Sequence, residues 1–231
     1  MENFIRNNYP KAIPGLELTK QCTDKLFNDH GFHPSSTVLA TSVCSDEIIR
    51  SATNFRDYLD INSPFQLGGL AGFPFTGVTG LKAFAAHIPD NGAAIILYGP
   101  HIGISAKGEV GIMKRHGQIL ESTCCGALVA SLGSLEMGPS PEADSEYDYQ
   151  QWKIESELHP HRDKILGKPI PLVNATEVMY GRINQRVHEL LEKASDSLKG
   201  RKIALVGGII INTDTNLPDW FDLKNFEVLE F

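Results

Sequence analysis

Three apolar runs rich in β-branched residues constrain the fold of this chain more than any other feature of its sequence. They span residues 36–44, 93–98 and 202–212, and residues that break regular structure flank each of them. Short strands that are apolar along their whole length are typical of a parallel sheet covered by helices on both faces. A Gly-Gly pair inside the third run indicates a bulge or a split. A fourth run, residues 226–231, alternates and predicts an edge or terminal strand.

Helical patterns fall between these runs. Residues 46–59 begin with two acidic residues after a serine, as a helix N-terminus does. Residues 125–135 are small and apolar and predict a buried helix, while residues 175–198 place their apolar side chains on one helical face. No shift in composition divides the chain. We therefore predict a single α/β domain over residues 1–231, with a mainly parallel central sheet flanked by helices.

Charge and composition exclude several classes of protein. The 28 acidic residues outnumber the 21 basic ones and give a formal charge of -7. That sign disfavours binding to nucleic acid and to anionic membranes, since both need cationic side chains. No run approaches the roughly 18 apolar residues of a membrane span, and residues 1–11 lack the apolar core of a secretory signal. We expect a soluble protein in a reducing cytoplasm, or in an organelle if a transit peptide has been removed.

Cysteine and histidine residues stand where the expected strands end. Cys44 ends the first run, His101 follows the second, and Cys124 and Cys125 open an expected helix. Open parallel sheets build their sites beyond the carboxyl ends of strands, so Cys44 and His101 could converge there. Two thiolates and one imidazole with an open fourth position describe a catalytic zinc site. The alternative is that each cysteine is a small buried hydrophobe, since the chain has no closely spaced ligand pair.

An acidic residue and a basic residue follow the first cysteine. Asp46 and Arg50 are four positions apart, so they share one face of the expected helix and can form an ion pair. The arginine would keep the carboxylate ionised. Asp46 could then accept a hydrogen bond from a zinc-bound hydroxide and orient it. The alternative is an ordinary surface salt bridge.

Taken together, four blocks of sequence resemble a known family. The Cys-x-Asp start at Cys44 resembles the zinc and Asp-Arg elements of β-type carbonic anhydrases. With three further blocks it resembles the limiting-CO2-inducible protein B/C family, a β-carbonic-anhydrase-like group also called the theta class. These blocks are GGLAGFPFTG at 68–77 followed by TG at 79–80, YGPHIG at 98–103, and CCGA at 124–127. The resemblance is strongest over residues 35–135.

This resemblance implies an α/β fold, a homodimer and a zinc ion. It implies that Cys44, His101 and Cys125 hold the zinc, with Cys125 preferred to Cys124 by the family register. It also implies that Asp46 and an arginine form an orienting dyad. In the β-class pattern the arginine follows the aspartate by two positions, where this chain has an isoleucine. Arg50 is therefore the preferred dyad arginine, and Arg56 is the alternative.

The resulting hypothesis is a zinc-dependent carbonic anhydrase. The enzyme would interconvert CO2 and bicarbonate by means of a zinc-bound hydroxide. Phe65, Phe73 and Phe75 either form an apolar wall for CO2 or pack in the core, and Gln66 could donate to a bicarbonate oxygen. Two alternatives stand beside it. One is a catalytically weak carbonic-anhydrase-like zinc protein that binds bicarbonate or a partner, and the other is a thiol enzyme that pairs a cysteine with His101.

Overall fold

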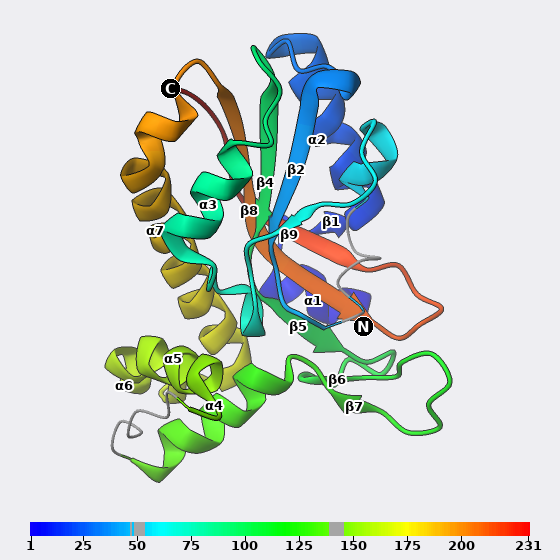
Figure 1. Cartoon of the computed structure of the whole chain (residues 1–231). Coiled ribbons are helices and arrows are strands. Elements are labelled where there is room, and N and C mark those ends of the chain that lie inside the picture. Colours follow the sequence, from blue (N-terminus) through cyan, green and yellow to red (C-terminus); the bar gives the residue numbers. More distant parts are fainter. Residues whose placement is uncertain (47, 49–53, 139–145) are drawn as a thin grey trace.

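A seven-stranded sheet runs through the centre of the molecule in the computed structural model, which describes residues 1–46, 48, 54–138 and 146–231 (Figure 1). The strands of this sheet are β1 (Ile13–Pro14), β2 (Thr37–Ser42), β3 (Phe65–Gln66), β4 (Ala93–Tyr98), β5 (His101–Ile104), β8 (Lys202–Thr213) and β9 (Trp220–Glu230). They lie in the order β1-β9-β8-β4-β2-β3, and β5 also pairs with β8. A separate antiparallel ribbon consists of β6 (Ile112–Met113) and β7 (Ser122–Thr123).

The three predicted apolar runs form the centre of the sheet as β2, β4 and β8. These strands are parallel and start in register, with Thr37 opposite Ala93 and Ala93 opposite Lys202. Strands β3 and β5 are also parallel to their neighbours, whereas β9 and β1 are antiparallel. The prediction of a mainly parallel sheet is therefore confirmed. The predicted strand at 226–231 is the end of the longer strand β9.

Helices cover the sheet on both sides. Figure 1 shows α3 (Gly77–Ala85) and α7 (Pro171–Leu198) on one side and α2 (Gly15–Asp29) on the other. The remaining helices are α1 (Glu2–Asn8), α4 (Gly126–Met137), α5 (Tyr149–Leu158) and α6 (Arg162–Leu166), with 3-10 turns η1 (Pro34–Ser36), η3 (Phe55–Tyr58), η4 (Leu70–Gly72) and η5 (His159–His161). The predicted helices at 125–135 and 175–198 correspond to α4 and α7, but α4 is not buried throughout, because it buries only Leu128, Ser131 and Leu135. None of the helices among the described residues has the length and apolarity needed to cross a membrane.

A glycine between β4 and β5 lets the chain pass close to β8. Gly99 has φ +147, and a Cβ at this position would lie 1.7 Å from the carbonyl oxygen of Gly208. Only glycine fits such a contact. The pairing of β8 with β9 shifts register between Gly207 and Gly208, so the Gly-Gly pair forms the predicted irregularity. His101 consequently opens β5, a short strand that the sequence patterns did not predict.

The predicted helix at 46–59 is wrong for the part that the structure describes. Residues 47 and 49–53, with Arg50 among them, lie outside the described residues. Asp46 itself is not helical, and the stretch ends in the 3-10 turn η3. The Asp46 carboxylate accepts a hydrogen bond from the backbone N–H of Ile48 at 3.3 Å.

Candidate metal centre

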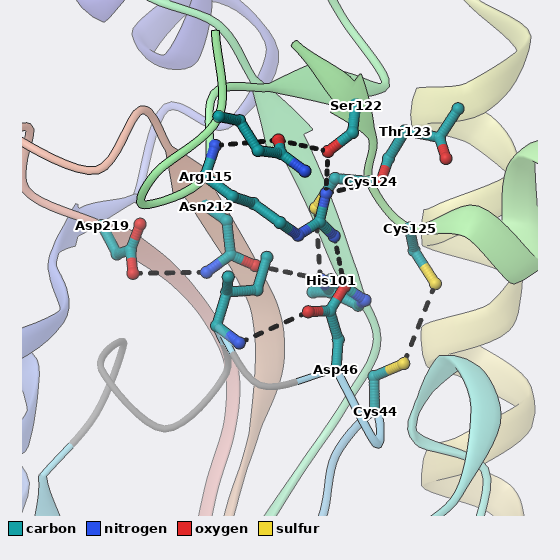
Figure 2. A network of polar contacts seen from close by, with 12 residues as sticks. Cys44, Asp46, His101, Arg115, Ser122, Thr123, Cys124, Cys125, Asn212 and Asp219 are labelled. Carbon is teal, nitrogen blue, oxygen red and sulfur yellow. Dashed lines mark hydrogen bonds and ion pairs between the residues drawn. The ribbon is translucent and has the colours of Figure 1, made fainter. Parts of the chain in front are cut away.

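Three side chains from distant parts of the chain come together at one edge of the main sheet (Figure 2). Cys44 lies two residues beyond the end of β2, His101 opens β5, and Cys125 occupies the N-cap position of α4. Their potential ligand atoms all lie within 4.8 Å of one another. Cys44 and His101 lie at the same end of the sheet because β2 and β4 run parallel and in register, and His101 follows β4 after two residues.

The cluster has the dimensions and chemistry of a metal site. Cys44 Sγ and Cys125 Sγ are 4.0 Å apart. Two thiolates on a tetrahedral zinc ion, each with a bond of about 2.3 Å, would be about 3.8 Å apart. All three residues are buried, and the Nε2 atom of His101 has no hydrogen-bond partner among the described residues. A buried imidazole nitrogen without a partner is costly unless it binds something, so the Cys-His-Cys cluster could bind a metal ion.

The two thiols influence each other's proton affinity. The hydrogen bond with Cys125 raises the pKa of the Cys44 thiol well above its usual range, and burial adds to this shift. The same contact lowers the pKa of Cys125 against the opposing effect of burial, with help from backbone N–H groups at the start of α4. Cys125 is therefore the thiol with greater thiolate character, as expected for a cysteine at a helix N-terminus.

His101 is subject to opposing influences. Complete burial lowers its pKa, whereas the nearby thiols of Cys124 and Cys44 raise it, and the net direction is upward. Its Nδ1 atom lies 2.9 Å from Asn212 Oδ1 and 3.5 Å from Cys124 Sγ. Cys124 therefore contacts the Nδ1 end of the ring. It groups with Asp46 and His101, whereas Cys125 groups with Cys44 and His101.

An arginine from the β6–β7 ribbon forms an ion pair with Asp46. Arg115 Nη2 lies 2.6 Å from Asp46 Oδ2, and the two side chains are only 15% and 13% exposed. The guanidinium also donates to the carbonyl oxygen of Thr123 at 3.1 Å and to the hydroxyl of Ser122. These bonds fix its plane against β7, so the carboxylate of Asp46 is held beside the cysteine–histidine cluster (Figure 2).

Sequence reasoning missed this arginine. Arg115 is 69 positions from Asp46 and lies in a connection between two strands of two residues each. No periodic pattern marks such a position. The sequence favoured two other arginines as partners of Asp46. Arg50 lies outside the described residues, and Arg56 donates to the carbonyl oxygen of Asn62 at 3.5 Å.

A cavity of about 360 Å³ adjoins the cluster. Its wall includes Cys44 and Asp46, and its apolar part includes Leu39, Val43, Pro64 and Leu97, with Gln66 and Arg56 among the polar groups. The three phenylalanines considered above do not line it. Phe73 packs against Phe75 at 5.2 Å between ring centroids, and Phe65 packs against Phe84 at 5.5 Å. Of the two interpretations of these rings, packing is therefore the one that the structure favours.

Comparisons with known proteins agree with this picture. The model of the limiting CO2-inducible proteins B/C beta carbonic anhydrases matches residues 13–230. The crystal structure of PtLCIB4, described as a homologue of the limiting CO2-inducible protein LCIB, is similar over 100% of this chain and 96% of that chain, with 32% identity and a TM-score of 0.91. The crystal structure of LCIB itself covers 97% of this chain and 92% of its own, with 21% identity and a TM-score of 0.72, and shows a shared fold. A comparison with curated proteins gave no match. The chain therefore belongs to the family of limiting CO2-inducible proteins B/C beta carbonic anhydrases.

Proposed function

We propose that this protein is a zinc-dependent carbonic anhydrase that interconverts CO2 and bicarbonate. The observation that carries the proposal is the buried cluster of Cys44, His101 and Cys125 beside an ion-paired aspartate and a cavity. In this proposal the two sulfurs and the imidazole Nε2 hold the zinc. Family membership supports the same reaction. When bound, zinc acts as a Lewis acid and lowers the pKa of a water ligand toward about 7.

Asp46 and Arg115 supply the orienting dyad in this proposal. An ionised carboxylate accepts hydrogen bonds and cannot donate them, so Asp46 fixes the direction of an O–H group that points at it. Arg115 keeps this carboxylate ionised and in place through its own bonds to Ser122 and Thr123. Arg50 remains a second candidate for the arginine, on the spacing of the sequence alone.

The adjoining cavity is the proposed binding place of the carbon substrate. Leu39, Val43 and Leu97 offer an apolar surface, which suits neutral CO2. Gln66 offers a donor for the charged product. The hydroxyl of Thr41 donates to Gln66 Oε1 at 3.2 Å, so the Nε2 end of the amide is the one that can donate to a bicarbonate oxygen.

Zinc analysis combined with stopped-flow CO2 hydration on the same preparation tests this proposal. We expect wild-type protein to bind one zinc and to hydrate CO2, Cys44→Ser to lose both properties, and Asp46→Ala to keep zinc but lose turnover. Cys22→Ala is the matched control, because this buried cysteine belongs to α2 and to neither potential metal-binding group. Full activity in zinc-free protein would contradict the proposal. Zinc without turnover would instead favour the weakly active bicarbonate-binding or partner-binding protein.

We also infer a homodimer and a reducing compartment, either the cytoplasm or an organelle. The dimer rests on family resemblance, and light scattering of the purified protein measures it. The reducing compartment follows from the proposed ligands, since cysteines bind zinc only as free thiolates. All four cysteines of the chain are free. Imaging of the tagged protein in its own cells tests the compartment.

A further inference from the structure

A chain of hydrogen bonds reaches the candidate metal centre from the end of β8 (Figure 2). Asn212 Nδ2 donates to Asp219 Oδ2 at 3.2 Å, and Asn212 Oδ1 lies 2.9 Å from His101 Nδ1. Asn212 and His101 are both fully buried. We infer that Asn212 and Asp219 are positioning residues, which keep a proton on His101 Nδ1 and so reserve Nε2 for the metal. This inference rests on the zinc centre proposed above.

The Asp219 carboxylate sets the direction of each hydrogen bond that leads from it to His101. An ionised carboxylate only accepts hydrogen bonds, so Asp219 forces the amide of Asn212 to turn its NH2 group toward it. The carbonyl oxygen of the same amide then faces His101, and a carbonyl oxygen also only accepts. Nδ1 must therefore carry the hydrogen. A neutral imidazole has a single N–H, which leaves a lone pair on Nε2.

Asp219, the outer end of this chain of hydrogen bonds, is itself held in place by the backbone. The backbone N–H of Thr213 donates to Asp219 Oδ1 at 2.8 Å, so both carboxylate oxygens accept bonds from neighbouring residues at the end of β8. Asp219 thus holds the side chain of Asn212 while it binds the backbone one residue later. The side chain of Asn212 is consequently fixed at both ends, by Asp219 and by His101.

The state of Nε2 is the second observation behind the inference. This atom is buried and has no hydrogen-bond partner among the described residues, while Nδ1 has two neighbours, Asn212 Oδ1 and Cys124 Sγ. A histidine that served only to fill the core would gain by bonding at both nitrogens. The arrangement instead matches metal-binding histidines, whose second nitrogen donates to an oxygen that sets the ring orientation.

Zinc affinity, measured by competition with a chromogenic chelator, tests the inference without reference to turnover. We expect Asn212→Leu to weaken zinc binding about 10- to 100-fold, as loss of such outer contacts typically does. The double exchange Asn212→Asp with Asp219→Asn should restore most of the affinity. In that exchange a carboxylate accepts from His101 Nδ1, and the new amide donates to the carboxylate. A residue with a merely structural role would not be rescued in this way.

The matched control is Asp214→Asn. This carboxylate also accepts backbone N–H groups, from Ala106 at 3.0 Å and from Lys114 at 2.7 Å, and it lies in the same connection between β8 and β9. We expect its zinc affinity to equal that of wild type. Nitrogen NMR of isotope-labelled histidine in the zinc-loaded wild type should show a proton on His101 Nδ1 and a metal-bonded Nε2.

Three results would overturn the inference: wild-type zinc affinity in folded Asn212→Leu, no recovery in the folded double exchange, or an NMR signature with the proton on Nε2. If Asn212→Leu does not fold, the NMR measurement on wild type and the double exchange decide the question. Wild-type protein that binds no zinc would contradict the proposed function itself, and the inference would fall with it.

Discussion

Arg115 Nη2 lies 2.6 Å from Asp46 Oδ2, and this contact joins the β6–β7 ribbon to the end of the first central strand. The pair is largely shielded from water, with 15% and 13% of the two side chains exposed. Ion pairs at the surface contribute little, whereas a shielded pair with further hydrogen bonds holds its geometry. A fixed carboxylate is what an orienting group needs, since small errors of position reduce catalysis strongly.

Arg115→Ala should lower kcat/KM for CO2 hydration by about 100-fold or more, the usual contribution of a positioned proton-accepting or orienting group. Zinc content should not change, because Arg115 is not a ligand. Stopped-flow assays with zinc analysis measure both quantities. Arg6→Ala is the matched control, because Arg6 makes an ion pair of the same length with Glu2 at the surface. Equal activity of the Arg115 and Arg6 variants would contradict the role of Arg115. A similar loss of kcat/KM in Arg50→Ala, with zinc retained, would support Arg50 as the dyad arginine.

The two adjacent cysteines should respond differently to replacement. Cys125→Ser should abolish stoichiometric zinc binding, because it removes a sulfur that groups with Cys44 and His101. Serine is a good N-cap, so α4 should keep its first turn in this variant. Cys124→Ala should retain zinc. Zinc analysis of both proteins decides the matter, with circular dichroism as the check of folding, and the reverse pattern would identify Cys124 as the ligand.

The central sheet was predictable from the sequence because its strands are apolar along their whole length. Strands β4 and β8 have the predicted extents almost residue for residue, and β2 lies within the first predicted run. Strand β5 and helix α5 were not predicted, because a strand of four residues and a polar helix carry weak periodic signals. The predicted helix after Cys44 is wrong for the described part of that stretch, where Asp46 is not helical and Phe55–Tyr58 form a 3-10 turn.

The residues of the candidate site also fall into two groups, those that could be predicted from the sequence and those that could not. Cys44 and His101 could be proposed from sequence because each stands where an expected strand ends, and parallel topology brings such positions together. The preference for Cys125 over Cys124 came from the family resemblance. Arg115 and Asn212 could not be proposed from the sequence. Arg115 is 69 positions from Asp46, and Asn212 is 111 positions from His101, so only the folded chain shows that each pair is in contact.

Zinc binding at pH 7 should release a proton from Cys44, because the pKa of this thiol is raised and it therefore holds its proton in the metal-free protein. Since zinc must displace this proton, its apparent affinity should fall as the pH falls, by about 10-fold per pH unit for each proton released. Calorimetry in two buffers of different ionisation enthalpy measures the release. Cys22→Ala should release the same number of protons as wild type, and binding without proton release would contradict the assigned direction.

Replacement of Gln66 should separate the binding of bicarbonate from the hydration of CO2. Gln66 lines the cavity beside Cys44 and Asp46, and its Oε1 already accepts from Thr41, so Gln66→Leu removes the donor proposed for bicarbonate. A hydrogen bond to a charged ligand contributes about 1.5 kcal/mol or more, which corresponds to about a 10-fold change in binding.

Inhibition of CO2 hydration by added bicarbonate should therefore weaken about 10-fold in Gln66→Leu. The value of kcat/KM for CO2 should change little, because the neutral substrate needs no donor at this point. Gln21→Leu is the matched control, since Gln21 lies on the exposed face of α2 and donates to Glu17. Unchanged inhibition by bicarbonate would exclude Gln66 as the donor. A fall in kcat/KM without a change in inhibition would instead indicate that the side chain shapes the cavity for CO2.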